Sequence, residues 1–361
     1  MARVLSLLGK GGVGRSTLTL AMARTEARRG RRVLVVSLEP VSAVGLLLDT
    51  RLSPEPIEVE PQLSVVHFST TALIERNWNR LRSAEEEYSR IPLFREVYGQ
   101  ELGVLPGLDQ LLVMSSLRDY DLSGQYDLIF FDGGAALDQL RMFAVPEQLS
   151  WYIRRFGEAF ARSAIGQVLS PFIEPITRAI LTVNFSTESV RATTGRFSDI
   201  LNEGKAVMQN PERLLLYLVS TADPLAIATT RQLWGISQLL GFNVGGALVR
   251  GDADWKEAFA PLPVRAIPEA AIADLPAALE GLATVDGAAF PKPLQIDERA
   301  RTVRIFLPGL TKKQVELNQY GPELTLRAAD QRRNVDLPAS FRGLRASGAK
   351  FQDHYLTVTF G

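Results

Sequence analysis

The stretch Gly9-Lys10-Gly11-Gly12-Val13-Gly14-Arg15-Ser16-Thr17 decides the fold of this chain. An apolar run, Val4 to Leu8, precedes it and is typical of a buried strand, and the residues from Leu18 onward continue as a helix. A glycine-rich turn between a strand and a helix directs backbone N–H groups at an anion, which is how a P-loop holds phosphate. The pattern G-x-x-x-x-G-K-[ST] is met except at Arg15, where lysine is expected, and a second cation, Lys10, follows the first glycine.

Composition limits the classes of protein that remain. The 361 residues indicate two domains or one large one, and 46% hydrophobic residues are enough for a sizeable core. Lys+Arg and Asp+Glu balance at 40 each, so no overall field favours nucleic acid. Cysteine is absent, which excludes disulfides and thiol chemistry, and two histidines are too few for a histidine metal site. We find no signal peptide and no apolar run that could serve as an integral membrane segment, so we expect a cytoplasmic protein.

The first 285 residues follow the pattern of an open α/β sheet with helical insertions. Continuous apolar runs predict parallel strands buried on both faces. These expected strands cover residues 4–8, 32–37, 63–68, 126–132, 214–219, 244–249 and 264–267. Residues 52–66 contain three prolines and are expected to be a loop leading into the third strand. Helix-like spacing dominates about 70–122 and 147–210, which we expect to be insertions into the sheet domain.

A second half of a nucleotide site is predicted at Asp132, which ends the apolar run 126–131. An aspartate at the end of such a strand holds Mg²⁺, directly or through water, opposite the P-loop hydroxyl, here Ser16. Glu39 follows another strand at the same edge, where ligands bind in open α/β sheets. A glutamate at a strand end is often only solvated, so a role for Glu39 in positioning water is one of two alternatives.

An apolar stripe at helical spacing runs through Trp151, Phe156, Phe160, Ala164 and Val168. Its simplest interpretation is the buried face of a core helix. The alternative is one wall of an apolar groove for a client segment, opened when nucleotide rearranges the protein.

The last part of the chain has a different pattern. Gly287, Pro291 and Pro293 indicate a linker over 286–294, and short alternating runs separated by turn residues predict a small antiparallel sandwich over 295–361. The expected strands cover residues 302–307, 315–318, 324–327, 334–337, 350–351 and 355–360.

Several segments together resemble one family. The early Lys10 resembles the deviant P-loop of dimeric ATPases. Ser37-Leu38-Glu39-Pro40 is similar to a switch I segment, and Phe131-Asp132-Gly133-Gly134-Ala135 through Leu140-Arg141 is similar to switch II, of the arsenite-pump (ArsA) and tail-anchored-protein targeting ATPases. The tail looks like an α-crystallin domain, on three segments: Leu307-Pro308-Gly309-Leu310, Asn334-Val335-Asp336-Leu337-Pro338, and Ala349-Lys350-Phe351 through Leu356-Thr357-Val358-Thr359-Phe360. An ATPase of this family joined to such a domain resembles a branch found in phototrophs.

This resemblance implies a fold and a set of roles. The fold is an α/β P-loop NTPase parallel sheet with a helical insertion subdomain, followed by an all-β α-crystallin-like sandwich. The protein would be a homodimer that binds ATP or ADP with Mg²⁺ and handles a hydrophobic client segment such as a tail-anchor helix. Lys10 would reach the partner's phosphates and Glu39 would orient water, as catalytic residues. Nucleotide would contact a set made of Gly9, Gly11, Gly12, Val13, Gly14, Arg15, Ser16, Thr17 and Arg250, with Ser16 and Asp132 on the metal.

Departures from the family pattern leave two functions open. Arg15 replaces the P-loop lysine, Glu39 replaces an aspartate, and switch II lacks its usual threonine at Gly133. Arginine keeps the charge but is bulkier and spreads it over a plane. Arg250 stands where the family has an asparagine near adenine, and a surface arginine is its alternative interpretation. The chain is thus either an ATP hydrolase with slow turnover or a chaperone or regulatory module in which nucleotide is mainly structural.

Overall fold

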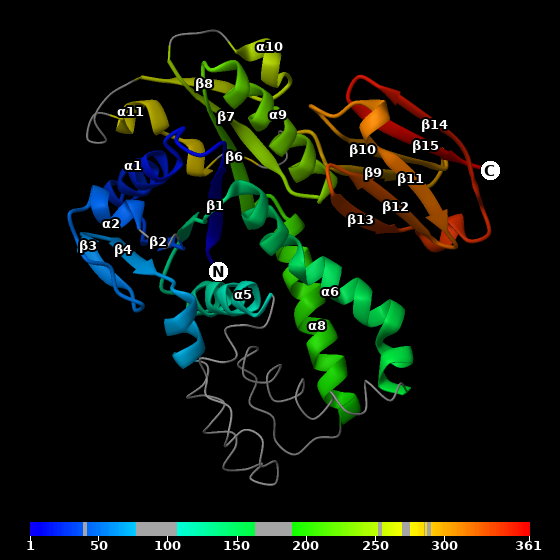
Figure 1. Ribbon diagram of the computed structural model, residues 1–361, viewed down its shortest axis with the longest axis horizontal. Coiled ribbons are helices and arrows are strands. Elements are labelled where there is room, and N and C mark those ends of the chain that lie inside the picture. The colour runs from blue at the N-terminus through cyan, green and yellow to red at the C-terminus, as the bar shows by residue number, and fades with distance from the viewer. Residues whose placement is uncertain are drawn as a thin grey trace.

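Figure 1 shows a computed structural model of the chain, in which an α/β part lies beside a β-sandwich and two long helices extend away from both. The structure describes residues 1–38, 42–76, 107–162, 190–251, 255–268, 275–284, 286 and 290–361. Glu39, Ala164, Val168 and residues 287–289 of the expected linker lie outside these residues, and the side chain of Phe160 is likewise not described.

One eight-stranded sheet organises the α/β part, in the order β3-β4-β2-β5-β1-β6-β7-β8. Every neighbouring pair is parallel except β3 with β4. The strands are β1 (Arg3–Leu8), β2 (Val33–Ser37), β3 (Ile57–Glu60), β4 (Leu63–His67), β5 (Leu128–Asp132), β6 (Leu214–Thr221), β7 (Val244–Arg250) and β8 (Val264–Ile267). The central strands are buried almost throughout, as their continuous apolar runs predict.

The sheet confirms the expected α/β class, with one correction. Residues 57–60, which the prolines placed in a loop, form the edge strand β3, antiparallel to β4. The prolines themselves, at 54, 56 and 61, stand just outside that strand. Proline is tolerated beside and along edge strands because no ladder hydrogen bond is lost there, so it did not exclude a short strand.

Helices cover both faces of this sheet (Figure 1). They are α1 (Arg15–Arg28), α2 (Ala43–Leu47), α5 (Leu108–Leu122), α6 (Ala136–Arg162), α8 (Val190–Gln209), α9 (Pro224–Leu239), α10 (Lys256–Phe259) and α11 (Pro276–Leu279), with a 3-10 turn η3 (Leu282–Thr284). The helix expected from about residue 147 begins already at Ala136, directly after the switch II loop, and runs on through Pro146. The long helices α6 and α8 pack against each other, and Gly204 of α8 meets Pro146 at their contact.

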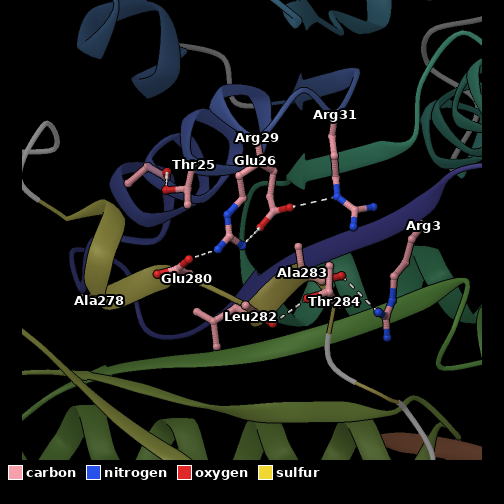
Figure 2. A network of polar contacts seen from close by, with 12 residues as sticks. Arg3, Thr25, Glu26, Arg29, Arg31, Ala278, Glu280, Leu282, Ala283 and Thr284 are labelled. Atoms are coloured by element: carbon pink, nitrogen blue, oxygen red, sulfur yellow. Dashed lines mark hydrogen bonds and ion pairs between the residues drawn. The ribbon is translucent and has the colours of Figure 1, made fainter.

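A polar network ties the segment after β8 back to the first helix (Figure 2). Glu26 is buried on α1 and forms ion pairs with Arg29, at 3.5 Å, and Arg31, at 3.3 Å. Arg29 also pairs with Glu280, just after α11. Arg3 of β1 donates to the carbonyl of Ala283 at 3.1 Å. A buried carboxylate is costly unless cations compensate it, so this network fixes residues 280–284 against α1.

The C-terminal region is the expected antiparallel sandwich. One sheet has the order β14-β15-β10-β9 and the other the order β11-β12-β13. The strands are β9 (Leu294–Asp297), β10 (Thr302–Phe306), β11 (Glu316–Tyr320), β12 (Glu323–Ala328), β13 (Gln331–Asp336), β14 (Ala346–Gln352) and β15 (Tyr355–Phe360), with 3-10 turns η5 (Lys312–Gln314) and η6 (Ala339–Phe341). Strand β9 was not expected, and β14 is longer than its two predicted residues.

The sandwich packs onto α9 and α6 of the α/β part (Figure 1). Leu239 of α9 belongs to the sandwich's own apolar core, and Trp234 meets Phe306 of β10 with ring centroids 5.7 Å apart. Trp151 of α6 donates from its indole N–H to the Glu323 carboxylate at 3.2 Å. Trp151 is thus buried, as the core-helix interpretation of its stripe expects, although part of what covers it is the sandwich. Phe156 of the same stripe is 48% exposed, so the stripe is not a buried face along its whole described length.

Candidate functional site

The P-loop follows β1 at the carboxyl edge of the sheet and is shaped by its glycines. Gly12 and Gly14 have φ of 84° and 94°, a left-handed conformation that side chains rarely adopt. A Cβ placed on Gly9 would lie 2.3 Å from the carbonyl oxygen of Val219, so the loop presses directly on β6. A Cβ on Gly11 or Gly12 would meet no described atom within 4 Å, so this side of the loop is an open cradle.

Asp132 lies at the same edge, on the strand next to β1. Ser6 of β1 pairs in register with Phe131 of β5, which places the end of β5 beside the start of the P-loop. Asp132 is buried, and its backbone carbonyl accepts from the N–H of Leu38 at 3.1 Å. Ser16 lies in the first turn of α1, on the other side of the loop, and is partly exposed. A hydroxyl and a carboxylate are the hard oxygen ligands that Mg²⁺ prefers, so the residues present fit that ion.

Arg15 joins the P-loop to switch II. Its guanidinium donates to the backbone carbonyl of Gly134 at 2.7 Å, two residues after Asp132. A guanidinium carries five donors, more than this contact with Gly134 uses. Arginine in place of lysine at position 15 therefore keeps a positive charge at the P-loop. It also adds a hydrogen bond to the loop that precedes α6.

Gln139 lies beside the switch II loop, and sequence reasoning did not single it out. A Cβ on Gly133 would lie 2.8 Å from Gln139 Oε1, so the Gln139 side chain occupies the space that the family's threonine would need. Gln139 is buried and donates to Ser6 Oγ, which in turn donates to the carbonyl of Phe131 at 2.6 Å. The Gln139 side chain thus lies where a side chain at position 133 would be, and its hydrogen bond to Ser6 connects α6 with β1. A lone glutamine in a helix gave no signal of this role.

Lys10 points along the edge of the sheet toward α9. Its ammonium lies 3.9 Å from Asp223 Oδ2, and its side chain is 42% exposed. The same oxygen of Asp223 accepts from the N–H of Ala226 at 2.8 Å and so caps α9. Asp223 and Pro224 form a recognisable helix start at the beginning of α9. This pattern is the sequence signal that places Asp223 at a strand-to-helix connection, where Lys10 can contact it. Lys10 is in a weak, exposed ion pair and remains accessible to a second ligand.

Arg250 lies against the P-loop. A Cβ on Gly14 would be 2.9 Å from Arg250 Nη1, although 236 positions separate the two residues in the sequence. The end of β7 reaches the loop because β6 and β7 extend the sheet from β1 at the same edge. The structure therefore brings together Lys10, Gly14, Arg15, Asp132 and Arg250 among the predicted residues, whereas Glu39 lies outside the described residues.

Replacing Arg250 with alanine is expected to weaken nucleotide binding by about 10- to 100-fold, since a charge-assisted hydrogen bond contributes about 1.5–3 kcal/mol. Titration of a fluorescent ADP analogue measures the change. Arg327→Ala is the matched control, because Arg327 lies in the sandwich in an exposed ion pair with Glu316 at 3.8 Å. Equal affinities for Arg250→Ala and wild type would place Arg250 outside the nucleotide site.

A parallel sheet with a glycine cradle after its central strand and an aspartate ending the next strand defines a P-loop nucleotide-binding protein. The chain belongs to the anion-transporting ATPase family, which matches residues 2–250. The HSP20-like domain found in ArsA proteins matches residues 298–360, the region of the sandwich. This confirms the predicted resemblance for both parts of the chain.

Relatives of similar length share both parts. The protein "Putative arsenical pump-driving ATPase" of Chlorobaculum tepidum is 23% identical over 99% of this chain and 96% of its own length. The "Putative arsenical pump-driving ATPase 1" of Aquifex aeolicus is 22% identical over 99% of each chain. "ATPase GET3" of Mycosarcoma maydis is 20% identical over 65% of this chain and 68% of its own length.

No helix in the described part of the chain has the length and apolar character needed to cross a membrane.

Proposed function

We propose that this protein is a dimeric Mg-ATP hydrolase in which bound nucleotide controls an apolar groove for a hydrophobic client segment. The observation that carries the proposal is the juxtaposition of the open P-loop cradle with Asp132 at one edge of the sheet. Family membership supports an ATPase activity. The relatives named as pump-driving and GET3 ATPases support the same class of reaction.

The residues at this edge divide the work of binding and reaction. Backbone N–H groups from Gly11 to Ser16 hold the β-phosphate, and Arg15 and Arg250 add positive charge around it. Ser16 and Asp132 hold Mg²⁺, which neutralises charge on the phosphates when it is bound. Lys10 of one protomer contacts the phosphates bound by the other, as an arginine finger does. Glu39 positions the attacking water.

The surface around Lys10 supports a dimer at this edge. Leu225, two residues after the Asp223 that Lys10 contacts, is 60% exposed. Large apolar side chains are energetically better placed against a partner than in water. A second copy facing this edge would cover such residues and bring its own Lys10 toward the bound nucleotide.

An apolar cavity of about 130 Å³ between the insertion helices supports the proposed groove. Leu111, Met114 and Leu117 of α5, Val145 of α6 and Val207 and Met208 of α8 line it. Because α6 begins directly after the Gly134 carbonyl that Arg15 contacts, a displacement of switch II by nucleotide would move one wall of the cavity. Methionine and aliphatic side chains adapt to different apolar partners, which suits a client segment such as a tail-anchor helix.

Lys10→Ala is expected to reduce steady-state ATP hydrolysis by about 10³-fold, the effect of removing a charge-stabilising finger. The affinity for nucleotide should fall far less, since the P-loop amides and Ser16 remain. Turnover is measured by phosphate release and affinity by titration with a fluorescent analogue. Lys312→Ala, in the exposed turn η5 of the sandwich, is the matched control. Unchanged turnover in Lys10→Ala would reject the trans-lysine mechanism.

The second candidate is a chaperone or regulatory module in which nucleotide mainly holds the structure. Arg15 favours it, because its contact with Gly134 fixes switch II to the P-loop and its delocalised charge differs from that of a lysine. Steady-state hydrolysis by the wild-type protein in excess Mg²⁺ separates the two. Nucleotide binding with no measurable turnover would select the module, whereas turnover that depends on Lys10 would select the enzyme.

A further inference from the structure

An open hollow lies on the outer face of the sandwich sheet, over the three neighbouring strands β14, β15 and β10. Its volume is about 620 Å³, and every residue that lines it belongs to the described part of the sandwich. In Figure 1, β14 and β15 lie on the side of the sandwich away from the α/β part. The hollow is therefore separate from the nucleotide cradle.

The register of the three strands places two cations and a hydroxyl in one row across this hollow. Arg304 of β10 pairs with Thr357 of β15, and Thr357 pairs with Lys350 of β14. Directly opposite residues of antiparallel strands share a face of the sheet, with Cβ atoms about 4.5–5.5 Å apart. The short Thr357 thus lies between two long side chains. Gly348 of β14 adds a second short position, since a Cβ there would meet no described atom within 4 Å.

Neither cation of this row has an ion-pair partner among the described residues. The Arg304 guanidinium lies over the Tyr355 ring, 4.4 Å from its centroid, and a contact with a ring face leaves the N–H groups free to donate. Of the residues that line the hollow, only Asp353 carries a carboxylate, and it forms an ion pair with neither Arg304 nor Lys350. The row therefore presents two uncompensated positive charges on each side of a hydroxyl.

This arrangement matches a tetrahedral oxyanion better than a nucleic-acid strand. A phosphoryl group carries a charge of about −1.5 to −2 and three strong acceptor oxygens. A guanidinium can contact two such oxygens and an ammonium a third. Single-stranded nucleic acid, in contrast, requires aromatic rings on which bases stack. Tyr355 is the one aromatic residue lining the hollow, and Arg304 already lies over its ring.

We propose that this hollow binds a phosphoryl group. The Arg304 guanidinium and the Lys350 ammonium donate to its oxygens from two sides, and the Thr357 hydroxyl donates from the sheet between them. Free inorganic phosphate and a phosphorylated side chain of a partner protein are the two sources of this chemistry. The site lies wholly within the sandwich, so it does not rest on the proposed ATPase activity.

Titration of inorganic phosphate into the full chain, followed by NMR of the backbone amides, tests the site residue by residue. At low ionic strength the amides of Gly348, Lys350 and Thr357 should shift together, with a dissociation constant on the order of 1 mM. Phosphate bound at the P-loop would shift a different set of amides, from Gly11 to Thr17. The measurement therefore distinguishes failure of this site from failure of the nucleotide site.

Variants of the two cations test whether they hold the anion. Lys350→Gln keeps a hydrogen-bonding side chain on the exposed strand but removes its charge, so phosphate binding should weaken by about fivefold. The double variant Arg304→Gln with Lys350→Gln should show no saturable shift in β14 and β15. Lys312→Gln, in the exposed turn η5, removes a charge elsewhere in the sandwich and should keep wild-type affinity.

A short peptide with phosphoserine between glycines separates the two sources, with its unphosphorylated form as the control. If the phosphopeptide binds at least as tightly as inorganic phosphate, the site accepts a phosphorylated side chain. If inorganic phosphate alone binds, the site is specific for the free ion. Unshifted amides in β14 and β15 with both ligands, or wild-type affinity in the double variant, would overturn the proposal.

Discussion

Gly235→Ala is expected to separate the sandwich from α9. A Cβ at this position would lie 2.4 Å from the carbonyl oxygen of Pro308 and 2.8 Å from Leu310 Cγ, so the backbone of the loop after β10 must move. The helix itself gains from the change, since alanine is about 1 kcal/mol more favourable than glycine inside a helix. The destabilisation is therefore confined to the seam, where inserting a methyl group into a packed contact costs about 1–3 kcal/mol.

The result is measured by hydrogen exchange and limited proteolysis. Amides of β10 and β13 should lose protection, while those of β1, β5 and β6 keep it. Gly348→Ala is the control, because Gly348 lies on the exposed strand β14 and a Cβ there would meet no described atom within 4 Å. Wild-type protection in Gly235→Ala would mean that the seam accommodates the methyl group and that the sandwich does not depend on this close approach.

Gly9→Ala is expected to abolish most nucleotide binding. A Cβ on Gly9 would lie 2.3 Å from the Val219 carbonyl and 2.9 Å from Val13 Cγ2. Val219 is fully buried in a central strand, so the P-loop must shift rather than β6. A shifted loop misaligns the backbone N–H groups, and each hydrogen bond to a charged phosphate contributes about 1.5–3 kcal/mol. Losing one or two of them weakens binding by about 100-fold or more.

Titration with a fluorescent ADP analogue measures this loss, and circular dichroism with thermal unfolding checks that the variant is folded. Gly348→Ala serves again as the control, since it adds the same methyl group far from the nucleotide site. A dissociation constant within a few-fold of wild type for Gly9→Ala would show that the contact with Val219 does not shape the cradle.

The nucleotide edge was the most predictable part of the protein. Apolar runs before Gly9 and Asp132 predict two strands, and the structure pairs these strands in parallel, so that their carboxyl ends lie side by side. Such a site depends on local signals, because the strand, the turn and the helix start are each encoded within a few residues. The short strand β3 was missed because prolines flank it and an edge strand needs few pairing partners.

Contacts between distant residues could not be derived from these patterns. Gln139 fills the space beside Gly133, Arg250 lies on Gly14, and Asp223 meets Lys10, each from an element that periodicity alone leaves unplaced. The stripe at Trp151 shows the same limit, since helical spacing predicts a buried face but not that Glu323 and Arg332 of the sandwich would cover it.

By itself the sequence determined the class of sheet, the glycine-rich loop after β1, the aspartate that ends β5 and the all-β character of the C-terminal region. Each of these follows from hydrophobic period and turn chemistry over short spans. Only the tertiary structure decided that the sandwich docks on α9 through Gly235 and that Arg304, Thr357 and Lys350 share one hollow. The physical reason is that docking depends on the shape and charge of two surfaces far apart in the chain, and neither surface reveals its partner.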